Sequence, residues 1–196
     1  MKDFKTSEGQ TPFDASGLIP ANIRNYKDLN AAEIRNILKA SRKHLRRHKN
    51  VARAWFTERF IRELHRDMFS DVWTWAGDYR DTEFNIGVKP FLIREEIAKL
   101  CQDVAAWDQD TSHPLPVLER AVRLHHRLGW IHPFPNGNGR LARLVLEIYL
   151  HAHDHPRPVW PDDEGKTRQD YLAALRQADH GDFTPLVECV RRFFPA

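Results

Sequence analysis

Cysteine and glycine are scarce in this chain of 196 residues, which holds two cysteines and nine glycines. Cys101 and Cys189 lie far apart, each within a helical pattern, so we expect free thiols in a reducing compartment rather than a disulfide. No stretch approaches the ~20 apolar residues that a membrane-spanning helix requires. The first residues also carry no apolar segment typical of a secretory leader. These features predict a protein of the cytoplasm that does not enter a membrane.

Positive and negative charges are nearly equal in number, with 30 Lys and Arg against 27 Asp and Glu, so the net charge is +3. Such a small excess does not indicate nucleic-acid binding. The one basic run, Arg42–Lys49, is more typical of a solvated helix face than of a contact to phosphate backbones. A chain of this length can bury one core. We therefore expect an aperiodic, extended N-terminal arm over residues 1–21 and a single domain over 22–196.

Apolar residues recur at helical spacing along most of the chain. Asn30 predicts a helix that starts near Ala31 and buries a stripe of Ile34, Ile37 and Leu38. Thr57 is the expected N-cap of the next helix. Further helices are expected over residues 94–107, from the prolines at 114 and 116 toward residue 129, and over 141–151, 171–177 and 185–194. The segment 141–151 is the most apolar and should form the central buried helix.

The helical period fails between Gly77 and Pro90. Residues 82–86 alternate polar and apolar side chains, Gly87 interrupts them, and Val88 resumes the alternation. This pattern predicts a short β-hairpin. The expected fold class is therefore all-α, a helical bundle around a central buried helix with one small β-hairpin flap.

One short segment combines a titratable imidazole, glycines and guanidinium groups, namely His132-Pro-Phe-Pro-Asn-Gly-Asn-Gly-Arg140 followed by Arg143. Its glycines let successive amide N–H groups face a common point, and the helix that follows adds its own N-terminal amides and dipole. Arg140 and Arg143 are three residues apart and share a helix face, where they could grip phosphate oxygens. His132 is a proton acceptor beside this concavity. The spacing predicts a site for phosphoryl or nucleotidyl transfer.

This segment resembles the signature of the Fic (Fido) family, His-x-Phe-x-(Asp/Glu)-Gly-Asn-Gly-Arg-x-x-Arg, at every fixed position except 136, where the chain has Asn. Val72–Arg80 is similar to the family's entry into its substrate-binding flap, and Tyr171–Leu186 to its closing helices. With Gln10-Thr-Pro-Phe-Asp14, the chain resembles the small branch called mobile mystery protein B. The resemblance extends over about residues 10–195.

The resemblance implies a Fic-type bundle and an enzyme, a protein adenylyltransferase (AMPylase) that moves AMP from ATP onto a hydroxyl of a target protein. Transfer of a phosphoryl group or phosphocholine is the enzymatic alternative. His132 would be the catalytic base. The nucleotide and phosphate ligands would be Gly137, Asn138, Gly139, Arg140 and Arg143, and a flap with Thr82, Phe84, Ile86 and Val88 would dock the target by strand addition.

Position 136 sets the expected metal requirement. In the family an acidic side chain here binds the Mg²⁺ that bridges the phosphates, whereas Asn136 offers one neutral oxygen. Three outcomes are open: the metal is held mainly by the phosphates, another acidic residue substitutes, or the site is metal-poor, slow or adapted to a different phosphate donor. We expect a weakened Mg²⁺ dependence. The alternative from another class is a degenerate Fic fold that binds a nucleotide or partner without turnover.

Many Fic proteins carry an inhibitory helix with the pattern Ser/Thr-x-x-x-Glu-(Gly/Asn), whose glutamate pairs with the second motif arginine. Glu8, Glu33 and Glu164 do not match this pattern, because none has Ser or Thr four residues before it. Any inhibition is therefore expected from a separate, antitoxin-like chain or from an element without this pattern, and the chain alone should have basal activity.

Overall fold

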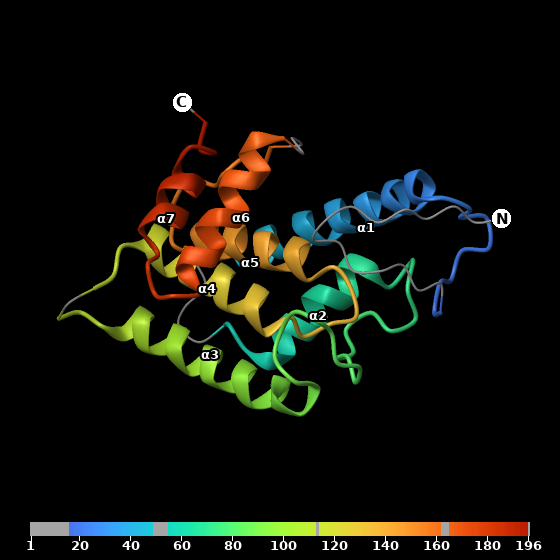
Figure 1. Cartoon of the computed structure of the whole chain (residues 1–196), viewed down its shortest axis with the longest axis horizontal. Helices are drawn as coiled ribbons and strands as arrows, with labels where there is room; N and C mark the ends of the chain where they lie inside the picture. Colours follow the sequence, from blue (N-terminus) through green and yellow to red (C-terminus); the bar gives the residue numbers. More distant parts are fainter. Residues whose placement is uncertain (1–15, 49–54, 113, 162–164, 196) are drawn as a thin grey trace.

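The computed structural model describes residues 16–48, 55–112, 114–161 and 165–195. Outside these ranges lie the part of the expected arm before Ser16, which includes Glu8, and also Lys49 and Glu164. Within them the chain forms helices and no strand, and an isolated antiparallel bridge joins Leu18 to Trp73, so the all-α fold class is confirmed (Figure 1). The elements are α1 Tyr26–Arg47, α2 Glu58–Phe69, the 3-10 helix η1 Pro90–Leu92, α3 Ile93–Gln109, α4 Val117–Ile131, α5 Asn138–Ala152, α6 Lys166–Ala178 and α7 Thr184–Arg191. No helix in the described ranges is long and apolar enough to cross a membrane.

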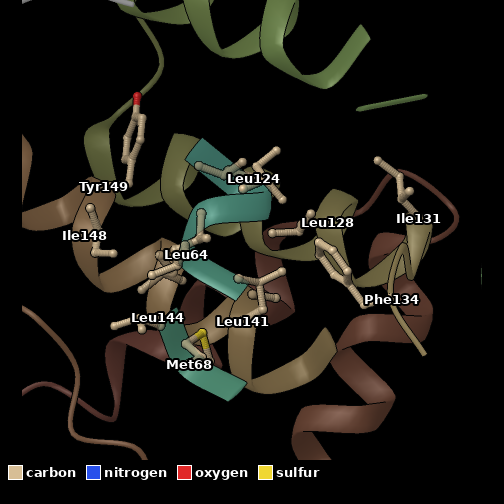
Figure 2. Close-up of a cluster of buried hydrophobic side chains, with 14 of the residues drawn as sticks. Leu64, Met68, Leu124, Leu128, Ile131, Phe134, Leu141, Leu144, Ile148 and Tyr149 are labelled. Atoms are coloured by element: carbon tan, nitrogen blue, oxygen red, sulfur yellow. The ribbon is translucent and has the colours of Figure 1, made fainter. Parts of the chain in front are cut away.

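Helix α5 lies at the centre of the bundle, as its composition predicted. It packs mainly against α4 and also contacts α1 and α2 (Figure 1). Nine of its residues are buried, and eight of these are apolar or aromatic, so almost its whole circumference faces other helices. Figure 2 shows side chains of α2, α4 and α5 meeting in one core, together with Phe134 from the α4–α5 loop.

Helix α2 begins where the sequence predicted. The Thr57 hydroxyl oxygen accepts a hydrogen bond from the Phe60 amide at 3.1 Å and satisfies one of the free amides of the first turn. Leu64 and Met68 are fully buried on the face toward α5. The cap and the apolar stripe together explain why this start could be read from the sequence.

Helix α1 differs from its prediction in both start and orientation. It begins at Tyr26 and is capped by Asn25. Two residues of the predicted stripe point outward, Ile34 at 54% and Leu38 at 52% exposed, and only Ile37 packs against the core, half-buried. Glu33 and His44 are buried instead. The stripe prediction is wrong because the polar side chains of α1 find partners on distant segments, which offsets the cost of burying them.

The predicted β-hairpin is not formed by residues 77–90, and this part of the prediction is wrong. The segment runs in turns and bends, with Gly87 in the left-handed region at φ 86°. Its main-chain groups bond elsewhere: the Val88 amide donates to the Ile131 carbonyl at 3.3 Å, and the Arg80 guanidinium occupies the carbonyls of Thr82 and Val88. Groups already paired in this way are not free to form a strand ladder.

Candidate active site

The segment from His132 to Gly137 connects α4 to α5. Helix α4 ends at Ile131, and His132 follows in a left-handed conformation with φ 53° and ψ 57°, where its amide donates to the Leu128 carbonyl at 3.2 Å. A residue with a Cβ rarely adopts this conformation, and such residues gather at functional sites. The turn brings the imidazole to the end of α4, a few residues before the start of α5.

The His132 imidazole is neutral and carries a free proton acceptor. Nδ1 lies 3.4 Å from the Gly129 carbonyl oxygen, so this nitrogen bears the hydrogen and Nε2 keeps its lone pair. Nε2 is shielded from solvent and has no hydrogen-bond partner among the residues described. Burial lowers the pKa of His132 to about 4, and the positive charge of Arg80 acts in the same direction. At pH 7 this nitrogen can accept a proton from a group that reaches it.

The N-terminus of α5 is open to an anion. Gly137 adopts φ 79°, and a Cβ there would lie 2.5 Å from Cζ of Phe69, so only glycine fits. Helix α5 starts at Asn138, and no side chain in the described ranges caps its first turn. A Cβ on Gly139 would meet no atom within 4 Å, so space is open beside these amides. Uncapped amides and the helix dipole together favour negative charge at this point.

His65 of α2 holds the motif loop in place, a role that the sequence did not reveal. Its ring stacks on Phe134 with centroids 3.8 Å apart and an angle of 9° between planes. Nε2 donates to the Asn136 carbonyl at 3.0 Å, and Nδ1 accepts from the Gly77 amide at 2.9 Å. Burial lowers the pKa of His65 to about 3. The one available signal was a histidine on the apolar face of a predicted helix.

Both motif asparagines brace the loop. The Asn136 side-chain oxygen accepts from the Gly137 amide at 2.6 Å. The buried Asn138 side chain bonds both main-chain groups of Phe134, at 2.9 and 2.8 Å, so this side chain fixes the loop in place. The described residues hold no group of three or more His, Cys, Asp or Glu side chains that could bind a metal ion. With a neutral, already bonded oxygen at position 136, these residues do not fit an Mg²⁺ held by the protein.

The two motif arginines have different surroundings. Arg140 lies over the Phe69 ring, and its Nη1 is 2.5 Å from Oε2 of Glu33. Arg143 is half-buried over the Trp160 ring at 5.8 Å and forms no ion pair within the described ranges. Burial lowers the pKa of Arg143. A partly desolvated guanidinium without a carboxylate partner favours binding of an anion.

Glu33 is a second site neighbour that the sequence did not reveal. It is 2% exposed, and its other oxygen accepts from Nε1 of Trp73 at 2.7 Å. The glutamate therefore joins α1 to the start of α5 through Arg140, and it does not contact Arg143. No pattern in the sequence indicates this pairing, because Glu33 and Arg140 are 107 residues apart.

The four predicted flap residues lie in different environments. Val88 is buried, and Phe84 lies under the Arg80 guanidinium at 5.3 Å. Thr82 and Ile86 are exposed, Ile86 by 45%. Only the latter two present their side chains freely to a partner.

Residues 55–150 match the model of the Fic/DOC family. The chain is 32% identical over 134 residues to "Protein adenylyltransferase fic-1" of Caenorhabditis elegans and 32% identical over 137 residues to "Protein adenylyltransferase Fic" of Nematostella vectensis, with 67% of this chain covered in each case. The alignments cover 26% and 31% of those relatives, so the chain spans less than a third of their length.

Solved structures agree with this match. A fragment of Fic-1 from C. elegans superposes with a TM-score of 0.67 at 27% identity, covering 95% of this chain and 56% of that one. BepC of Bartonella tribocorum, solved with bound AMPPNP, gives a TM-score of 0.69 over 93% of this chain and 97% of that one; its 17% identity supports the fold alone. Together, the motif, the helical architecture and these matches show that the chain belongs to the Fic/DOC family.

Proposed function

We propose that this chain is a protein adenylyltransferase, which transfers AMP from ATP to a hydroxyl group of a target protein. One observation carries the proposal: the free proton acceptor of a neutral His132 lies in the loop that leads into the uncapped N-terminus of α5. An anion site and a base in the same loop are the two elements that nucleotidyl transfer requires of a protein.

The reaction follows from these groups. Phosphate oxygens of ATP accept hydrogen bonds from the first amides of α5 and from Arg140 and Arg143. The hydroxyl oxygen of the target attacks the α-phosphorus while Nε2 of His132 takes its proton. The bond from the α-phosphorus to the oxygen that bridges it to the β-phosphorus breaks, and pyrophosphate leaves with that electron pair. Fixed amides and guanidinium groups stabilise the charge that develops on the phosphate oxygens.

ATP is proposed as the donor because two relatives carry the name protein adenylyltransferase and because BepC was solved with AMPPNP, an ATP analogue. The target supplies a serine, threonine or tyrosine hydroxyl, the side chains that match this chemistry. We further infer that the chain has basal activity without a partner, since Glu8, Glu33 and Glu164 all lack the Ser or Thr of the inhibitory pattern.

A binding module without turnover is the second candidate. Two observations favour it: Asn136 replaces the acidic residue of the family signature, and Nε2 of His132 is shielded from solvent. A module of this kind would bind the nucleotide reversibly at the same amides and arginines.

Intact-mass analysis separates the two candidates. The purified chain and a cell lysate are incubated with ATP and Mg²⁺, using ATP labelled in the α-phosphate in one sample and in the γ-phosphate in another. We expect protein to gain the mass of AMP with α-label, and His132→Ala to slow the gain by about 10²–10⁴-fold, the usual contribution of a general base. His180→Ala, at an exposed position between α6 and α7, is the matched control. Reversible binding alone would support the module, γ-label on protein would indicate phosphoryl transfer, and a near wild-type rate in His132→Ala would remove the enzyme proposal.

A further inference from the structure

Arg80 is a buried cation, 4% exposed, that forms no ion pair with any residue in the described ranges. Its guanidinium instead donates to three main-chain carbonyls: Nε to His132 at 2.7 Å, Nη1 to Thr82 at 2.9 Å, and Nη2 to Val88. Its own amide donates to the Pro133 carbonyl at 3.0 Å. One side chain therefore joins the histidine loop to both ends of the segment 82–88.

The bond from Arg80 bears directly on the conformation of His132. A left-handed backbone is unfavourable for a residue with a Cβ and persists only where surrounding contacts fix it. Both main-chain groups of His132 are fixed here, the amide by the Leu128 carbonyl at 3.2 Å and the carbonyl by Nε of Arg80. These bonds set the direction of the Cα–Cβ bond, and the contact of Nδ1 with the Gly129 carbonyl at 3.4 Å orients the ring, so together they determine where Nε2 lies.

The segment 82–88 is held against the histidine by the same guanidinium. Gly87 lies so close that an added Cβ would be 2.5 Å from Cβ of His132 and 2.8 Å from Nη2 of Arg80. The Val88 amide bonds the Ile131 carbonyl next to the histidine. Because Arg80 occupies the carbonyls of Thr82 and Val88, the spacing between this segment and the imidazole depends on it.

We propose that Arg80 is a positioning residue, which holds the left-handed backbone of His132 and the 82–88 segment in one arrangement, so that a hydroxyl bound along that segment meets Nε2. The catalytic part of this inference rests on the proposed function. A guanidinium suits the task because its planar group has five N–H donors in fixed directions, whereas a lysine ammonium cannot reach three carbonyls with the same geometry.

Two variants test the proposal. Arg80→Lys keeps the charge and removes the planar donor group, and Gly87→Ala keeps Arg80 but forces the segment away from His132. Arg62→Lys is the matched control, because Arg62 also donates to a carbonyl in this region, Gly77 at 2.9 Å, and does not touch His132. Displacement of a reacting group by about 1 Å can cost about 10²-fold in rate.

The first readout compares the rate of AMP transfer with the affinity for ATP. We expect Arg80→Lys and Gly87→Ala to lower kcat by about 10²-fold while the Kd for ATP stays within about twofold, because the phosphate-binding amides and arginines are untouched. Arg62→Lys should change neither value. A wild-type rate in Arg80→Lys, or parallel losses of rate and ATP affinity, would overturn the proposal.

The second readout needs no catalysis. The ¹³Cα and ¹³Cβ chemical shifts of His132 report its backbone conformation, and we expect them to leave the left-handed range in Arg80→Lys and to stay there in Arg62→Lys. Unaltered His132 shifts in Arg80→Lys would overturn the positioning role. A wild-type chain that transfers nothing would remove the proposed function alone, and the His132 shifts would then decide whether Arg80 sets this conformation.

Discussion

Replacement of Glu33 by glutamine should make the protein less stable and its affinity for ATP higher. Glu33→Gln retains an oxygen for the Trp73 indole and removes the negative charge beside Arg140. A hydrogen bond between charged groups contributes about 1.5–3 kcal/mol. Because the Arg140 side chain is 29% exposed and partly screened by water, we expect a loss in the free energy of unfolding of about 1–2 kcal/mol. For a chain of this size that lowers Tm by about 4 °C.

The effect on ATP has the opposite sign. Removal of a negative charge about 8 Å from a phosphate, at an effective dielectric constant of about 40, is worth about 1 kcal/mol, or about fivefold in affinity. Thermal unfolding and calorimetric titration with ATP measure both effects on the same preparation. The control is Glu63→Gln, which breaks a surface ion pair to Arg59 on α2 and should cost less than about 0.5 kcal/mol.

Two results would refute this reasoning. An unchanged Tm would mean that the buried Glu33 carboxylate adds nothing to stability. Weaker binding of ATP would mean that Glu33 serves the site by holding Arg140 in place, and that its charge is of minor importance.

Three further predictions concern other parts of the site and core. Asn136→Asp should make the Kd for ATP strongly dependent on Mg²⁺, measured with and without EDTA, while the wild-type Kd changes little; equal metal dependence would contradict this. Burial lowers the pKa of His65 to about 3 and of His125 to about 4, from 6.5. Between the folded pKa of each histidine and 6.5, the unfolded chain therefore binds one more proton than the folded chain at that histidine. As the pH falls below 6.5, each of the two histidines should lower the free energy of unfolding by up to about 1.4 kcal/mol per pH unit. Urea titrations from pH 7.5 to 5 measure the free energy of unfolding at each pH. A free energy of unfolding that falls as steeply with pH in His125→Gln as in the wild type would contradict this prediction. Phe134→Ala should cost about 3–5 kcal/mol by leaving a cavity against His65, whereas Phe91→Ala, at a position 77% exposed, should leave Tm almost unchanged.

The sequence was sufficient where local rules decide the structure. Thr57 could be assigned as a cap because its hydrogen-bond partner, Phe60, is only three residues away. Helix α5 could be placed at the centre because its apolar residues cover nearly its whole circumference. The turn in the motif loop could be predicted from its glycines, and Gly137 does adopt a positive φ. These features depend on neighbours in the chain.

The rest depended on contacts between distant residues. The orientation of α1 is set by Glu33, whose partners Trp73 and Arg140 are 40 and 107 residues away. The hairpin prediction was wrong because Arg80 bonds carbonyls that a strand would have used. Alternation of polar and apolar residues indicates a segment with one buried and one exposed face, and it carries no information about a guanidinium that competes for the carbonyls of a strand.

The loop between α4 and α5 has only six residues, His132 to Gly137, and all of them except Pro135 are buried or hydrogen-bonded to neighbouring segments. The positions of the two helices therefore fix the conformation of the loop. A longer loop would move the His132 imidazole away from the first amides of α5. Thr82 and Ile86 in the neighbouring segment are exposed, so their side chains can be exchanged without disturbing the core, and under the proposed function a change of target would require changes there and not in the loop.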